Sequence, residues 1–190
     1  YHLMDPKMSP VTIESFREIA RRFWGSAEAA DVSSYEGKAL AAVKIQNRCY
    51  SEDSLGLCDF AWPLAYSFTK PDHVGEPDLE ARIFTAVTGL PGEEIDRCTE
   101  RLVNVQRQIM LREGRKTPQD DFPAEVNFIQ PIPPVPPRMV PGPGDKPVNA
   151  AGKVLDRDKF SAMLKEYYRL RGWDEETGRP RKETLARLGL

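Results

Sequence analysis

The chain has 190 residues, of which 40% are hydrophobic, so it can form one core of ordinary size or two small ones. Its net charge of −2 argues against binding to nucleic acid, and no apolar run approaches the roughly 20 residues that a membrane-spanning helix needs. Three cysteines at uneven spacing, with no visible signal peptide, indicate a reducing, cytoplasmic location rather than a disulfide framework. Because residue 1 is not Met, we expect one part of a longer polypeptide.

The first fifty residues predict two helices. The first is expected from Ser9-Pro10 to Gly25, since apolar residues recur there with the period of a helix face. The second is expected to start at Ser33, in a capping-box pattern, and to run towards Tyr50. A turn-like stretch, "SEDSLGLCDF", follows at residues 51–60.

The middle of the chain predicts two further helices. A short one is expected from Asp78 to Gly89, and the longest from about Glu93 to Gly114. The long helix carries apolar residues at alternating spacings of three and four, which predict a buried seam. The members of this seam are Ile95, Cys98, Leu102, Val105 and Ile109.

The last third begins with a proline-rich stretch at residues 130–147. This composition favours an extended surface linker, with a docking motif for a partner as the alternative. After it, a helix is expected from Asp156 to Gly172 and a short terminal helix from Pro180. The predicted class is therefore all-α: an irregular multi-helix bundle with a long Pro-rich loop. We expect a helical region at 1–128, a linker or insertion at 129–153, and C-terminal helices at 154–190 that pack back on the same domain.

The chain contains no complete set of catalytic residues. Both histidines, His2 and His73, stand in expected loops, and the sequence has neither a glycine-rich phosphate loop nor a nucleophile elbow. The acidic pair Asp120-Asp121 is expected to be solvated. No residue is assigned as catalytic.

Three cysteines remain as candidate ligands. Cys98 on the predicted seam and Cys49 near the end of the second helix are expected to be buried, as small hydrophobic residues. Cys58 differs because it follows Asp53 and the flexible Gly56 within a short segment after a helix. Its thiolate could bind an iron–sulfur cluster, but a buried thiol in a turn explains the same spacing.

The stretch "DSLGLC" resembles the D-x-x-G-L-C motif of the tungsten-containing aldehyde:ferredoxin oxidoreductase family. "FWGSAEAADVSSYEGKA" is similar to the helix pair that precedes this motif in the family. "ERLVNVQRQIMLREGRKTPQDDFP" resembles the family's long helix and its continuation, and "MLKEYYRLRGWDEETGRPRKETLARLGL" resembles its C-terminus. The likeness covers about residues 12 to 125 and 154 to 190, which corresponds to the C-terminal helical portion.

The resemblance implies specific roles for the motif. Cys58 would be the fourth ligand of a 4Fe–4S cluster, Asp53 would contact the pterin of a tungsten (or molybdenum) bis-pterin cofactor, and Leu57 would lie beside the pterin through its backbone. The whole enzyme would oxidise aldehydes to carboxylic acids with ferredoxin or another electron-transfer subunit as acceptor. We also expect contacts with the remainder of the same polypeptide and allow for a homo-oligomer.

The chain departs from the family pattern because it lacks the other three cluster cysteines, a C-x-x-C-x-x-x-C group. It also lacks the β-rich domain that cradles the cofactor, so we expect the isolated segment to be inactive. Two alternatives stay open. One is the branch of the same family that reduces benzoyl-coenzyme A, and the other is a non-catalytic helical interaction module in which Cys58 is a plain core thiol. An exposed apolar patch near Leu55, Leu57 and Phe60 would fit a missing cofactor.

Overall fold

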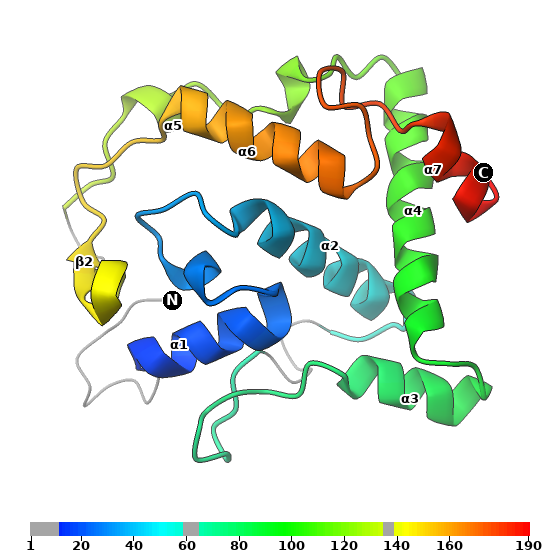
Figure 1. Cartoon of the computed structure of the whole chain (residues 1–190), viewed down its shortest axis with the longest axis horizontal. Helices are drawn as coiled ribbons and strands as arrows, with labels where there is room; N and C mark the ends of the chain where they lie inside the picture. The colour runs from blue at the N-terminus through cyan, green and yellow to red at the C-terminus, as the bar shows by residue number, and fades with distance from the viewer. Residues whose placement is uncertain (1–11, 59–64, 135–138) are drawn as a thin grey trace.

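The computed structural model describes residues 12–58, 65–134 and 139–190, which form seven α-helices and one small antiparallel hairpin (Figure 1). Helix α2 (Lys38–Ser54) runs through the middle of the molecule. It packs against α4 (Glu93–Arg112) on one side and α6 (Arg157–Leu170) on another. The prediction of a helical fold class is confirmed.

The first helix, α1 (Ile13–Ile19), runs without interruption into a π-helical turn, η1 (Ala20–Trp24). The hydroxyl of Thr12 caps its start by accepting a bond from a backbone amide of the first turn at 3.1 Å. Gly25 ends the pair with φ of +86°, as predicted. The predicted start at Ser9-Pro10 lies outside the described residues.

Helix α2 begins later than the capping-box pattern predicts. After a 3-10 turn, η2 (Ala27–Ala30), the carboxylate of Asp31 accepts bonds from the amide and the hydroxyl of Ser33, at 2.8 and 2.7 Å. This local turn engages Ser33 before it can cap a helix. The helix starts instead at Lys38, after Gly37 with φ of +71°.

The predicted seam of α4 is wrong at Cys98, Leu102 and Ile109, which are exposed, whereas Ile95 is buried and Val105 is half-buried. Helix α3 (Leu79–Thr88) ends at Gly89 as predicted and leads into α4. On α4 the side chains of Leu102 and Ile109 are each 41% exposed. The helix buries instead the side chains of Ile95, Thr99, Val103, Asn104 and Arg107.

Polar pairing explains why α4 buries its less apolar face. The indole N–H of Trp173 donates to the side-chain oxygen of Asn104 at 2.8 Å. The guanidinium of Arg107 donates to both carboxylate oxygens of Asp121, at 2.8 and 2.5 Å. A count of apolar residues cannot find such a face, since its partners come from distant parts of the chain.

The side chain of Asp121 is therefore only 9% exposed, and the prediction that the Asp120-Asp121 pair is solvated is wrong for this residue. It lies at the end of a 3-10 turn, η3 (Gln119–Asp121), and also accepts a bond from the hydroxyl of Tyr168 at 2.5 Å. Burial and this carboxylate together raise the pKa of the Tyr168 phenol. Asp120, by contrast, is exposed as predicted.

Part of the proline-rich stretch forms a small hairpin. Strands β1 (Met139–Pro141) and β2 (Pro147–Asn149) pair antiparallel around a tight turn, η4 (Pro143–Asp145). Both strands are edges of a two-stranded sheet, which tolerates proline. Arg17 of α1 ties the hairpin down through an ion pair to Asp145 and a bond to the carbonyl of Gly142 at 2.9 Å.

The C-terminal helices follow the sequence closely. After a single turn, α5 (Val126–Ile129), the carboxylate of Asp156 caps α6 by accepting bonds from the amides of Asp158 and Lys159. Helix α7 (Lys182–Leu188) packs on α4, where Arg101 donates to the carbonyl of Leu188 at 2.9 Å. In the part of the chain that the structure describes, no helix has the length and apolarity to cross a bilayer.

Candidate functional site

The motif that the sequence singles out lies at the C-terminal end of α2. Asp53 belongs to the last turn of this helix rather than to the segment after it, which corrects the sequence prediction. The amide of Gly56 donates to the carbonyl of Asp53 at 3.2 Å, and the amide of Leu57 donates to that of Glu52 at 2.9 Å. These two bonds form a Schellman motif, with Gly56 at φ of +68°. The glycine is needed because other residues adopt this conformation only with strain.

The motif presents two exposed polar side chains, one in the last turn of α2 and one just after the helix end. Asp53 and Cys58 are both exposed. No other described residue forms a hydrogen bond or ion pair with the carboxylate of Asp53 or the thiol of Cys58. A Cβ at Gly56 would meet nothing within 4 Å, so the backbone between them borders open space. The amide of Leu57 is already used, whereas its carbonyl accepts no backbone hydrogen bond from another residue that the structure describes.

A buried ion cluster holds the end of α2 in place. Arg48 lies 3.2 Å from the carboxylate of Glu52 and 2.8 Å from that of Glu80 on α3. Its guanidinium also lies 4.9 Å from the ring centroid of Phe23 in η1. The i, i+4 spacing of Arg48 and Glu52 would have revealed half of this cluster. Glu80 carried no signal, since it comes from a helix more than twenty residues away.

The other two cysteines are not core residues. Cys49 and Cys98 are exposed, so the prediction that they are buried is wrong. Cys98 is exposed because α4 buries a different face from the predicted one. Within residues 12–58, 65–134 and 139–190, no group of three or more His, Cys, Asp or Glu residues could hold a metal ion. The described residues around Cys58 therefore do not form a metal site of three or more such side chains.

The predicted apolar patch beside the motif is present in part. Leu55 is exposed and Leu57 is half-buried, whereas Phe60 lies outside the described residues. His73 stands in a loop as predicted, where its Nδ1 lies 3.1 Å from the carbonyl oxygen of Ser67.

These features define a helical domain that offers one carboxylate and one free thiol at a helix end. The chain matches the family model of aldehyde ferredoxin oxidoreductase, domains 2 and 3, over residues 2–190, and it belongs to this family. The match agrees with the resemblance of the "DSLGLC" stretch, and it runs through the proline-rich segment as well.

Proposed function

We propose that this chain is the C-terminal part of a tungsten- or molybdenum-containing oxidoreductase that converts aldehydes to carboxylic acids. In this proposal Cys58 is one ligand of a 4Fe–4S cluster, and Asp53 contacts the pterin. The observation that supports it best is the common position of the two exposed, unengaged groups at the end of α2 in a member of this family.

The two side chains suit these roles chemically. A thiolate is the usual ligand of an iron–sulfur cluster. A carboxylate accepts bonds from N–H donors, such as those at the edge of a pterin, more strongly than a neutral side chain does. The Leu57 carbonyl would offer a second acceptor beside Asp53, while the Schellman motif at Gly56 fixes both positions.

The bound cofactors would supply the redox chemistry, in which an aldehyde and water give a carboxylic acid, two protons and two electrons. Ferredoxin or another electron-transfer subunit would accept the electrons. The whole chain has only three cysteines, with no C-x-x-C pair among them, so it holds no second set of cluster ligands. We therefore expect this segment by itself to be inactive.

The test is metal analysis of the full-length protein. We expect iron and tungsten or molybdenum in the purified protein, and a 4Fe–4S signal by electron paramagnetic resonance after reduction. Cys58→Ala should lower the iron content and change this signal, whereas the matched variant Cys98→Ala should not. A Cys58→Ala protein with unaltered iron content and spectrum would show that this residue is not a ligand. Assays with an aldehyde and with benzoyl-coenzyme A would separate the two branches of the family.

A non-catalytic interaction module is the second candidate, and the exposed face of α4 favours it. Cys98, Leu102 and Ile109 lie along one face of this helix and leave apolar surface open to a partner, including a second copy of the chain. Full-length protein that is free of iron, tungsten and molybdenum but forms a stable complex through this face would support the module and contradict the enzyme.

A further inference from the structure

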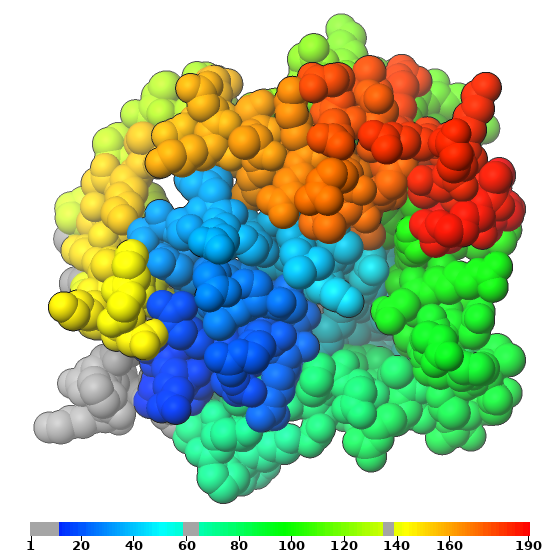
Figure 2. Space-filling view, viewed as in Figure 1, coloured from blue at the N-terminus to red at the C-terminus, as the bar shows by residue number. Residues whose placement is uncertain are grey.

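A hollow in the surface lies at the N-terminal end of α2, opposite the end that carries Asp53 and Cys58. It encloses about 610 Å³ between the segment before α2, the residues around α5, the 150–155 segment and the start of α6. Figure 2 shows this face of the molecule, where the orange α6 and the light-blue start of α2 border the hollow. A helix of the length of α2 spans about 25 Å. The hollow is thus a separate place from the motif.

The hollow continues as a groove along the two helices. A shallower hollow of about 470 Å³ follows α2 and α6, and Lys38, Phe160 and Met163 line both spaces. The two spaces therefore adjoin at these three residues, and together they are called the channel, with the larger hollow as its deep end. Its dimensions fall within the range of small-molecule sites.

Hydrogen bonds between distant segments fix the walls of the deep end. The amide of Ile132 donates to the carbonyl of Lys153 at 3.0 Å, and the amide of Leu155 donates to the carbonyl of Asn127 at 3.0 Å. The hydroxyl of Tyr35 accepts a bond from a backbone amide at the start of α6 at 2.8 Å. The cavity is therefore formed before any ligand arrives, which lowers the entropic cost of binding. These amides are also satisfied, so they offer no free edge to an extended peptide.

The walls are mainly apolar, and part of that surface is open to water. Val32, Val126 and Val154 are each about half exposed at the mouth of the hollow. A ligand that covers them would remove apolar surface from water, at roughly 25 cal/mol per Å². The larger apolar side chains of the lining are Ile132, Leu155, Phe160, Met163 and, in the groove, Ile45 and Leu164.

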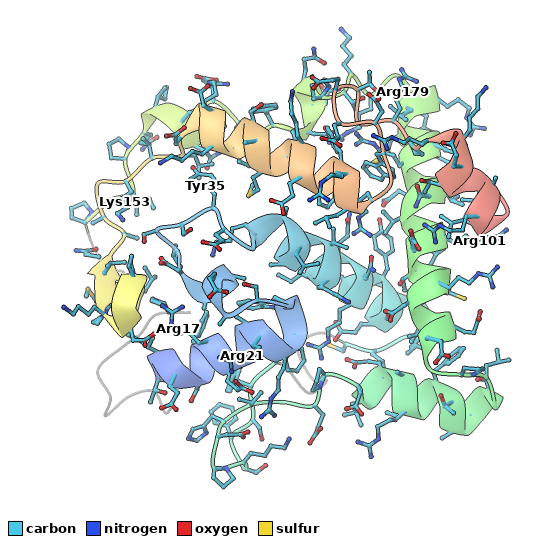
Figure 3. All side chains as sticks on the ribbon, in the orientation of Figure 1. Arg17, Arg21, Tyr35, Arg101, Lys153 and Arg179 are labelled. Atoms are coloured by element: carbon cyan, nitrogen blue, oxygen red, sulfur yellow. The ribbon has the colours of Figure 1, made fainter. Side chains whose placement is uncertain are left out.

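The charged side chains in the lining are all positive. Among the described residues that line the two spaces, none is acidic, whereas two are lysines. The ammonium of Lys38 donates to the carbonyls of Ala29 and Asp31, so its charge is already engaged and mainly its methylene stem is available to the groove. Lys153 is exposed and has no ion pair with any other residue that the structure describes. Figure 3 shows Lys153 at the outer end of this region, beyond Tyr35.

We propose that this channel binds an amphiphilic carboxylate, a long-chain alkyl or arylalkyl acid. The apolar chain lies along the groove between α2 and α6, and the carboxylate lies at Lys153. Apolar walls disfavour a small polar anion, and the exposed ammonium of Lys153, which has no ion pair with another described residue, favours an acid over a neutral or cationic amphiphile. This site does not depend on the cofactor assignment of Cys58.

Calorimetric titration of the purified full-length protein with dodecanoate, below its micellar concentration, tests the proposal. We expect saturable binding of one molecule per chain. Lys153→Glu should weaken it by about tenfold, because charge reversal replaces an attraction by a repulsion of similar size. Ala42→Trp, which fills the groove from an exposed position on α2, should abolish it. Lys146→Glu, an exposed lysine outside the lining, is the matched control and should bind normally.

Three outcomes would overturn the proposal. One is the absence of saturable heat, and another is equal affinity for dodecanoate and dodecyltrimethylammonium. The third is self-association that Ala42→Trp abolishes, with no dodecanoate bound, which would assign the groove to a second copy of the chain. The iron content of the same samples remains an independent readout of the cofactor assignment.

Discussion

Replacing Asp121 by Asn removes the negative charge at the centre of the buried network between α4 and α6. The side chains of Arg107 and Asp121 are only 6% and 9% exposed. Removing one partner of such a buried pair usually costs about 3–5 kcal/mol, because the other charge is left uncompensated. Arg107 also donates to the carbonyl of Gly178 at 3.0 Å and lies 4.5 Å from the ring centroid of Trp173. These contacts retain part of its stabilisation, so we expect a loss of about 3 kcal/mol.

The same pair predicts the pH dependence of the difference. Burial acts to raise the pKa of Asp121, but the bonds from Arg107 and Tyr168 outweigh it, and the pKa lies below its ordinary value. A lowered pKa in the folded state means that the ionised carboxylate stabilises the fold at every pH above the unfolded pKa, near 3.9. The stability difference between the wild type and Asp121→Asn should be constant from pH 7 to about 5, and it should shrink as the pH falls through the folded pKa.

Urea unfolding followed by far-ultraviolet circular dichroism measures both effects. We expect a lower midpoint for Asp121→Asn with an unchanged slope. Asp120→Asn is the matched control, because that carboxylate is exposed and bonds only the nearby amide of Lys116, at 2.7 Å. Its loss should stay below about 1 kcal/mol. Equal losses for the two variants, or a loss for Asp121→Asn that does not fade in acid, would refute this account of the network.

Three further substitutions test other parts of the structure in the same unfolding assay. Gly56→Ala should cost about 1–2 kcal/mol, because it forces alanine into the left-handed conformation of the Schellman motif; no loss would mean that α2 ends differently. Arg48→Met should cost about 3 kcal/mol by leaving buried carboxylates without their cation, and a stability equal to that of the wild type would contradict the cluster. Val103→Ala should cost about 2 kcal/mol while Leu102→Ala changes the free energy of unfolding by less than about 0.5, and the reverse order would restore the seam predicted from sequence.

Local signals were enough to find most helices. Asp156 and Gly25 mark helix ends in the sequence and do so in the structure, since capping depends on bonds within a few residues. The predicted start of α2 at Ser33 was wrong, also because of a bond within a few residues. Ser33 had a nearer partner in Asp31, and the two competing local patterns could not be ranked from the sequence.

The candidate site, too, could be predicted from the sequence only in part. The order of Asp53, Gly56 and Cys58 along the chain, and the likeness of their surroundings to one family, already identified the motif. The sequence could not reveal that Asp53 and Cys58 are exposed. Nor could it reveal that Glu80 of α3 forms an ion pair with Arg48 of α2. Exposure is a property of what packs nearby, and these neighbours are distant along the chain.

By itself the sequence therefore determined the helical class, the family and the position of the motif, because these depend on composition, on short-range periodicity and on residues within one segment. Tertiary structure decided which face of α4 is buried, paired the Asp121 carboxylate with Arg107 and set a hairpin from the proline-rich stretch against α1. It also formed the channel between α2 and α6, whose walls come from four separate segments. The physical reason is that buried polar groups need partners, and for Arg107, Asn104 and Arg48 some of these come from far along the chain.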